Sequence, residues 1–308
     1  MKMRNEIYKI FETSFNDGQF IRIGTNRNLN LYIGRDECGR YSFDFRGIYH
    51  PQRIAGSEVI SVFQTKVGNY IFLRFSLEAP DLLDCFCTFC EDLLTSTSDI
   101  TDDSIAYNTL YQRYLSWKKL FRPNLGKLSE PEIMGLIGEL IFMRDYMIPT
   151  YGCKTAIDSW TGPEKTHKDY SLSDKWFEIK TISTGKEVVR ISSIEQLDSE
   201  IDGQLYVYEL ERMSPSFDGL KLNGIINEII SLLPTSFVKD LFASKLELFG
   251  FDFSPEYDNF VYSNTSRSCY LVNQSFPRLK RSDLPIQIGH VQYDLMLSHL
   301  EDFSNRKE

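Results

Sequence analysis

Apolar and polar residues alternate in short runs between residues 20 and 75, and Gly and Asn residues separate the runs. The runs are FIRIGT, NLYIG, RYSFDFRG, SEVISVFQTKV and NYIFLRF. Alternation with a period of two is typical of strands with one buried face. The pattern predicts a meander of four or five antiparallel strands. We therefore expect residues 1–97 to form a β-rich N-terminal domain, which closes with a helix from Pro80 to about Leu94.

Two longer segments show helical periodicity. The first is predicted from Asp102 to Phe121 and carries its apolar residues on one stripe. The second begins at Ser129, a suitable N-cap because Glu132 stands three residues later, and it runs to about Met147.

Strand and helix signals are mixed in the rest of the chain. HKDYSL and KWFEIKTIS, separated by the turn SD, predict a hairpin. EVVRIS and QLYVYEL predict strands, with a short helix, SIEQLDSEI, between them. The last third predicts helices at 223–233 and 236–248, a β pair at NFVYSN and SCYLVNQ, and a final strand at VQYDLML. We therefore predict an α/β (α+β) chain with a central domain at residues 98–215 and an α/β extension packed on it at residues 216–308.

Composition fits a globular protein with well-packed cores, since 42% of the 308 residues are hydrophobic. The six cysteines are too sparse for a disulfide framework, and the three in DCFCTFCED suit buried thiols better than a zinc site. No apolar run approaches the ~20 residues that span a membrane, and the first residues do not resemble a secretory signal. We expect a cytoplasmic protein without membrane association. The chain also lacks a Gly-rich phosphate loop, so an ATP-driven step would need a partner.

The net charge of -9 argues against a protein that coats nucleic acid, but bases can still gather locally. Residues 111 to 127 contain five bases and no acid, and the segment FPRLKRSDLP is also basic. Either group could contact a phosphate backbone, or form an ordinary solvated surface. The candidate DNA-contacting residues are Lys118, Lys119, Arg122, Arg278, Lys280 and Arg281.

The predicted hairpin brings three charged side chains together. In KWFEIKT, Glu178 and Lys180 lie on the same face because successive strand residues alternate. The short SD turn places Asp169 of the neighbouring strand across from Glu178. Two carboxylates so close repel each other unless a cation lies between them, and magnesium binds through one or two carboxylates and substrate phosphate oxygens. The group therefore suits metal-dependent phosphodiester hydrolysis, although Glu178 and Lys180 could equally form a surface ion pair.

A further acid lies in the stretch MGLIGELIFM on the helix that begins at Ser129. Glu139 is the one charged residue of this stretch, and no cation lies three or four residues away to pair with it.

These elements together resemble the PD-(D/E)XK nuclease superfamily. GLIGELIF, KDYSL, FEIKT, RISSIEQL and FPRLKRSDLP more narrowly resemble a bacterial PD-(D/E)XK family of restriction and phage-defence gene clusters. The resemblance implies a restriction-endonuclease-like core of helix, three strands, helix and strand (αβββαβ), with strands near Ala156, Lys168 and Phe177. The proline that names the motif is absent, because Lys168 precedes Asp169.

The resemblance also implies a role for each acid. Asp169 matches the motif's Asp, Glu178 its second acid and Lys180 its Lys, and Glu139 is the acid that the first helix supplies. Glu139, Asp169 and Glu178 would hold Mg²⁺ or Mn²⁺, and Lys180 would act on the attacking water. Three further residues could support the site: Ser193, Gln196 and His167.

The expected function is a Mg²⁺-dependent DNA endonuclease of bacterial restriction or antiviral defence. The expected partners are DNA, an ATPase or methyltransferase subunit, and a second copy in a homodimer. The alternative is a catalytically inactive subunit that keeps the nuclease fold and binds DNA or a partner complex.

Overall fold

The computed structural model describes residues 2–12, 15–24, 26–121, 127–164, 167–285 and 287–304. The chain forms two compact units, one of Met1–Lys127 with Asn227–Pro255 and one of Leu128–Ile226 with Glu256–Glu308. The boundaries predicted after residues 97 and 215 fall inside these units, and the three-domain division stays a prediction. The predicted α+β fold class is confirmed, because helices and mostly antiparallel strands occur in both units.

The first unit contains a five-stranded antiparallel sheet in the order β1-β2-β3-β5-β4. Its strands are β1 (Phe20–Arg22), β2 (Leu31–Arg35), β3 (Tyr41–Gly47), β4 (Ile60–Val67) and β5 (Tyr70–Leu77). The antiparallel strands are as predicted, but the simple meander is wrong, because β5 pairs with both β3 and β4. Gly68, with φ of 62°, supplies the left-handed conformation of the tight β4–β5 turn.

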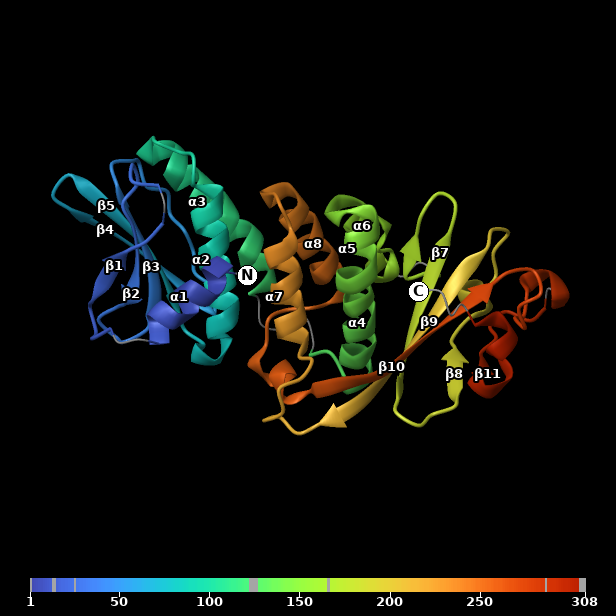
Figure 1. Ribbon diagram of the computed structural model, residues 1–308. Coiled ribbons are helices and arrows are strands. Elements are labelled where there is room, and N and C mark those ends of the chain that lie inside the picture. The colour runs from blue at the N-terminus through green and yellow to red at the C-terminus, as the bar shows by residue number, and fades with distance from the viewer. Residues whose placement is uncertain are drawn as a thin grey trace. The chain divides into compact units, whose positions relative to one another are not determined.

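Helices cover one face of this sheet, as Figure 1 shows for α2 and α3. The helices of the unit are α1 (Lys2–Glu12), α2 (Leu83–Ser96), α3 (Asp103–Leu120) and α8 (Ser236–Phe249), and α7 (Leu222–Leu232) spans the boundary between the two units. Phe75 of β5 packs its ring against Phe89 of α2 and Tyr114 of α3. Alternate residues of β3, Phe43 and Phe45, are fully buried, which explains the period of two in the sequence.

The second unit is built around a four-stranded mixed sheet in the order β10-β9-β7-β6. Its strands are β6 (Tyr170–Ser171), β7 (Trp176–Ser183), β9 (Gly203–Met213) and β10 (Val261–Val272). β7 and β9 run parallel, and α4 (Glu130–Phe142) packs on β7 (Figure 1). A separate pair joins β8 (Val188–Ile191) to β11 (Tyr293–Met296). The helix after α4 continues through a π-helical turn at Met143–Met147, then α5 (Ile148–Tyr151) and α6 (Cys153–Ser159).

Three predictions about the second unit are wrong. The strand predicted near Ala156 is the helix α6, which begins at the positive-φ residue Gly152. The predicted helix SIEQLDSEI contains only a single 3-10 turn at Ile194–Gln196. The two strands predicted at NFVYSN and SCYLVNQ form one strand, β10, because it pairs with the long strand β9, with a register shift between Asn264 and Ser266.

Candidate active site

The β6–β7 hairpin brings an acid onto the strand that carries the Glu-x-Lys motif. Tyr170 pairs with Phe177 and Ser171 pairs with Trp176. This register extends to place Asp169, the residue before β6, across from Glu178. The Oδ2 atom of Asp169 accepts a hydrogen bond of 2.7 Å from the backbone N–H of Ile179, which fixes the carboxylate beside β7.

Glu178 and Lys180 form an ion pair in the interior of the unit. Glu178 is fully buried, and Nζ of Lys180 lies 2.9 Å from its Oε1. Within the described residues, neither oxygen of Glu178 accepts a hydrogen bond of acceptable geometry. The ion pair with Lys180 is therefore the main interaction that stabilises the buried charge of Glu178. Burial raises the pKa of Glu178 to about 8, and the charge of Asp169 contributes to this rise. Burial by itself would lower the pKa of Lys180, but the attraction of Glu178 and Asp169 outweighs burial and raises it.

Glu139 approaches the same group from α4. Gly138 lies against the Thr181 side chain of β7, and the absence of a Cβ there allows the helix to approach the strand closely. Nε1 of Trp160 donates a hydrogen bond of 2.6 Å to Oε2 of Glu139, so the partner of this acid is a neutral donor. Burial raises the pKa of Glu139 well above its usual range, and the charges of Asp169 and Glu178 act in the same direction.

The backbone of Gly162 marks where two of these carboxylates meet. A Cβ atom at Gly162 would lie 2.7 Å from Oε2 of Glu139 and 3.5 Å from Oδ1 of Asp169. The structure thus brings Glu139, Asp169, Glu178 and Lys180 into one cluster. Burial is the largest cause of the raised pKa values of the three acids, and repulsion from neighbouring carboxylates adds to it for Glu139 and Glu178.

Gln196 contacts this cluster directly. Its Oε1 accepts hydrogen bonds from Nζ of Lys180, at 3.1 Å, and from the backbone N–H of Ser192, at 2.8 Å. Ser193 and His167 make no such contact among the interactions of the described residues. Ser193 begins the 3-10 turn without a side-chain capping bond, and exposed His167 acts electrostatically on Glu195.

Lys168 is a supporting residue that sequence reasoning missed. Its Nζ donates to three backbone carbonyl groups of the turn that carries Gln196: those of Glu195 at 2.6 Å, Gln196 at 2.8 Å and Asp198 at 3.0 Å. The ammonium also lies 4.0 Å from the ring centroid of Trp176. Burial lowers the pKa of Lys168 to about 8. The one sequence signal was its position immediately before Asp169, where the motif's proline would stand.

Arg278 and Lys280 of the segment FPRLKRSDLP contact the protein through their side chains, and Arg281 does so through its backbone. The guanidinium of Arg278 donates to the carbonyl groups of Leu197 and Ser199. The backbone N–H of Arg281 donates to Asp198, and Nζ of Lys280 lies 3.5 Å from the Gln274 side chain. Arg278 therefore helps to hold the turn that carries Gln196, and DNA contact by these three residues stays a prediction.

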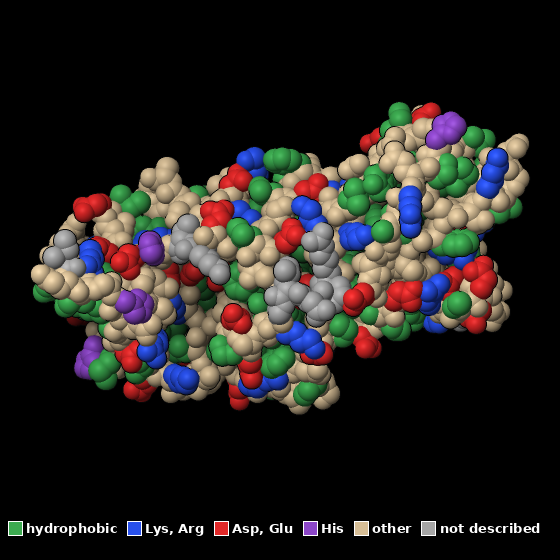
Figure 2. All heavy atoms as spheres, turned by 180° about the vertical axis from the view of Figure 1, so that it is seen from behind, with side chains coloured by type: hydrophobic (Ala, Val, Ile, Leu, Met, Phe, Trp, Pro, Cys, Tyr) green, Lys and Arg blue, Asp and Glu red, His purple; other side chains and the backbone are tan. Residues whose placement is uncertain are grey.

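The basic residues predicted on α3 also have protein partners. Nζ of Lys118 donates to the Ala55 carbonyl at 2.7 Å, and Nζ of Lys119 lies 3.8 Å from Oε2 of Glu247. Arg122 lies outside the described residues. On the face shown in Figure 2, basic and acidic side chains are interspersed. DNA contact by these residues stays a prediction too.

The cluster has the chemistry of a site for a hard divalent cation. Glu178 has two buried oxygens without hydrogen bonds among the described residues, and burial, with the charge of Asp169, raises the pKa values of Glu139 and Glu178. In the part of the chain that the structure describes, no three His, Cys, Asp or Glu side chains already form a metal-ligand group. Mg²⁺ commonly binds through only one or two carboxylates, so Glu178 and Asp169 fit it as ligands.

A helix-borne acid, an acid before a short strand and a Glu-x-Lys strand define a site of the PD-(D/E)XK type. The family model "Putative PD-(D/E)XK family member, (DUF4420)" matches residues 5–298, and the chain belongs to this family. No curated protein and no solved structure matches the chain. The family indicates a nuclease. Among the helices of the described residues, none is long and apolar enough to cross a membrane.

Proposed function

We propose that the protein is a Mg²⁺-dependent DNA endonuclease that hydrolyses phosphodiester bonds in bacterial restriction or antiviral defence. The observation that carries the proposal is the buried cluster of Glu139, Asp169 and Glu178 around Lys180, with acids whose pKa values are raised. A group of acids that lacks positive charge is costly to fold, and such perturbed groups concentrate at functional sites.

The three acids would hold the cation and Lys180 would act on the substrate. A bound Mg²⁺ or Mn²⁺ would neutralise charge on the phosphoryl group and assist deprotonation of the attacking water. Gln196 and Glu178 fix the Lys180 ammonium, which can orient that water and stabilise negative charge. Glu178 and Asp169 raise the pKa of Lys180, and a cation that they held would weaken this effect and favour an amine that can accept a proton.

Cleavage of supercoiled plasmid DNA with Mg²⁺ or Mn²⁺ tests the proposal. We expect Asp169→Ala and Lys180→Ala to lower the cleavage rate about 10²–10⁴-fold, as is typical for loss of a group that acts in proton transfer or charge stabilisation. Asp174→Ala and Lys154→Ala are matched controls, because both side chains are exposed and lie outside the cluster. Undiminished cleavage by both Asp169→Ala and Lys180→Ala would overturn the assignment.

The second candidate is an inactive subunit that keeps the fold and binds DNA or a partner complex. The net charge of -9 and the lack of a preformed three-ligand metal group in the described residues favour it. Calorimetry with Mg²⁺ separates the two candidates. Binding that is abolished by Glu178→Ala supports the enzyme, and absence of binding to the wild type supports the subunit. The ATPase or methyltransferase partner, the homodimer and the cytoplasmic location stay predictions.

A further inference from the structure

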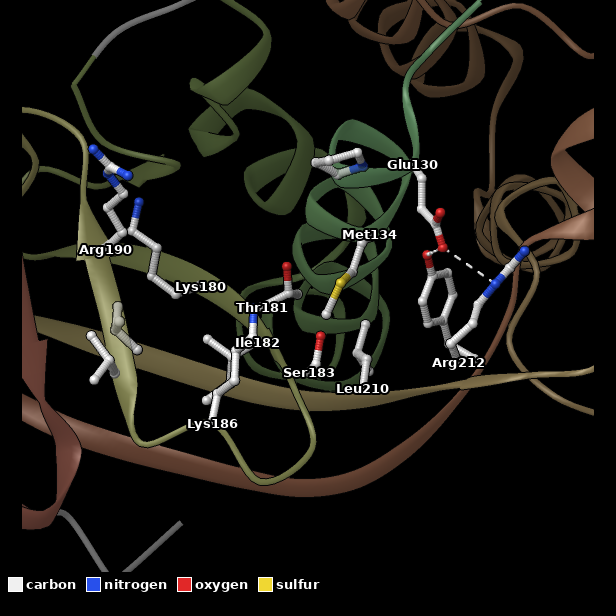
Figure 3. A pocket seen from close by; sticks show the side chains of 14 residues that line it. Glu130, Met134, Lys180, Thr181, Ile182, Ser183, Lys186, Arg190, Leu210 and Arg212 are labelled. Carbon is white, nitrogen blue, oxygen red and sulfur yellow. Dashed lines mark hydrogen bonds and ion pairs between the residues drawn. The ribbon is translucent and has the colours of Figure 1, made fainter.

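A pocket of about 470 Å³ opens beside Lys180 in the second unit (Figure 3). Its walls come from the N-terminal part of α4, the end of β7, the β7–β8 connection, β8, the far end of β9 and β10. In Figure 3 the charged ends of Lys180 and Arg190 point in the same direction. The proposed catalytic lysine therefore forms part of the wall of a larger concave surface.

The lining of this pocket is strongly basic. Lys180, Lys186, Arg190 and Arg212 line it, and Glu130 is the one acid among the lining residues that the structure describes. Lys186 and Arg190 are exposed, and Arg190 donates a hydrogen bond of 2.7 Å to the Gln292 side chain. A local surplus of positive charge in a chain with a net charge of -9 requires a specific explanation.

The bases come from consecutive elements of the chain and line one pocket. Lys186 lies in the β7–β8 connection, Arg190 on β8 and Arg212 on β9. An ordinary solvated surface would alternate the two signs of charge, whereas these residues surround one concavity. A phosphodiester backbone matches such a lining, because each phosphate carries one negative charge and accepts hydrogen bonds from Lys and Arg.

We propose that this pocket binds the DNA backbone next to the bond that is cut, with Lys186 and Arg190 on its phosphates. The inference rests on the proposed function, because Lys180 places the reacting phosphate at one end of the pocket. Phosphate contacts of this kind fix register and orientation without reading sequence. Lys186 and Arg190 are thus substrate-positioning residues.

Glu130 holds Arg212 in the absence of DNA. Oε1 of Glu130 lies 3.2 Å from Nε of Arg212 and accepts a hydrogen bond of 3.3 Å from the hydroxyl of Tyr262. Figure 3 shows the Glu130–Arg212 pair at the opposite end of the pocket from Arg190. An entering phosphate competes with Glu130 for Arg212 and is repelled by the Glu130 carboxylate. Removal of this negative charge should therefore strengthen DNA binding.

Fluorescence anisotropy of a labelled DNA duplex tests the pocket in EDTA, where cleavage cannot occur. We expect Lys186→Ala/Arg190→Ala to weaken binding about tenfold or more and to reduce the slope of log K against log[salt] by about 2, since two phosphate contacts are lost. Glu130→Gln should bind more tightly than the wild type. Lys154→Ala, an exposed base outside the pocket, should keep the wild-type affinity and slope.

The outcomes separate this inference from the nuclease proposal. If Lys186→Ala/Arg190→Ala binds DNA with wild-type affinity and salt slope, the proposal that the pocket binds the DNA backbone is wrong, whether or not the protein cleaves plasmid. Weaker binding by Glu130→Gln overturns the competition between Glu130 and phosphate. If the wild type cleaves no DNA but the double variant loses binding and slope as expected, the pocket stands and the nuclease proposal fails.

Discussion

Each unit of the molecule contains a buried group of charged side chains, and the acids of the two groups are neutralised to different extents. In the first unit, the carboxylate of Asp92 on α2 lies 2.7 Å from Nζ of Lys239 and 2.8 Å from Nε of Arg113, and accepts a hydrogen bond from Trp117. In the second unit, three acids share Lys180. Burial alone would raise the pKa of Asp92, yet Lys239 and Arg113 outweigh it and lower the pKa, whereas the pKa of Glu178 rises.

The difference separates a structural ion network from a candidate binding site. Asp92 has two cations and a neutral donor, so its charge is stabilised and it joins α2 to α3 and α8. Glu178 pairs with Lys180, but burial and the charge of Asp169 outweigh this attraction and destabilise its charged form. An incompletely neutralised cluster lowers stability, and proteins retain such groups mainly where function needs them.

Removal of Asp92 should have the largest effect on stability. Asp92→Ala leaves Arg113 and Lys239 without their buried carboxylate, and breaking a buried ion pair in this way costs about 3–5 kcal/mol. The contribution of Asp92 is present above its unfolded pKa of 3.8 and is lost as the pH falls through its lower folded value. Denaturant unfolding at pH 7 measures the loss, with exposed Asp99→Ala as the control. A loss as small as that of the control would show that this network is not structural.

Replacement of Glu178 should increase the free energy of unfolding, the opposite of the effect expected for Asp92. Its pKa rises from 4.5 in the unfolded chain to about 8, so the folded state binds more protons between these values and stability falls as the pH rises. Glu178→Gln removes this penalty. We expect it to match the wild type near pH 4.5 and to be more stable by about 1–4 kcal/mol at pH 8.5, because each unit by which the folded pKa exceeds the unfolded pKa corresponds to about 1.4 kcal/mol.

Amide hydrogen exchange of β7 peptides measures this stability within the second unit. Mg²⁺ should increase the protection of these peptides in the wild type at pH 8.5 and leave Glu178→Gln unchanged, because the cation needs the carboxylate. Exposed Glu187→Gln is the control and should follow the wild type in both respects. If Glu178→Gln is less stable than the wild type at pH 8.5, the ion pair with Lys180 is structural and the comparison between the two clusters fails.

The parts of the site that depend on local spacing were predictable from the sequence. Strand alternation placed Glu178 and Lys180 together, and the short SD turn gave the register that brings Asp169 beside them. The capping box was also predictable, and Glu132 accepts hydrogen bonds from the backbone N–H and hydroxyl of Ser129. Within each of these features the residues are at most eleven positions apart, where one element fixes the geometry.

The parts that depend on distant partners could not be predicted. β8 pairs with β11, with Ile191 opposite Tyr293, and local periodicity cannot reveal a pairing over such a separation. The Trp160 donor to Glu139 and the carbonyl groups that bind Lys168 likewise come from other elements. The bases of the pocket beside Lys180 stand singly in the sequence and form no charged run, whereas the bases after residue 111 do.

Gln196→Ala should have the smallest effect of these variants. It tests how the proposed catalytic lysine, Lys180, is held in the cluster of the second unit. Lys180 is held by the carboxylate of Glu178 and by the neutral amide oxygen of Gln196, whereas Asp92 is held by two charged partners, Arg113 and Lys239. Loss of one neutral hydrogen bond costs about 0.5–1.5 kcal/mol, so we expect single-turnover cleavage to slow roughly 2–10-fold with KM unchanged. The pH–rate profile should also shift, because Gln196 contacts the Lys180 ammonium at 3.1 Å. Gln196→Glu keeps an acceptor oxygen but adds a negative charge, so it should raise the pKa of Lys180 and move the pH–rate profile to higher pH; exposed Gln287→Ala is the control. An unchanged rate and pH profile in Gln196→Ala would mean that Glu178 alone positions Lys180.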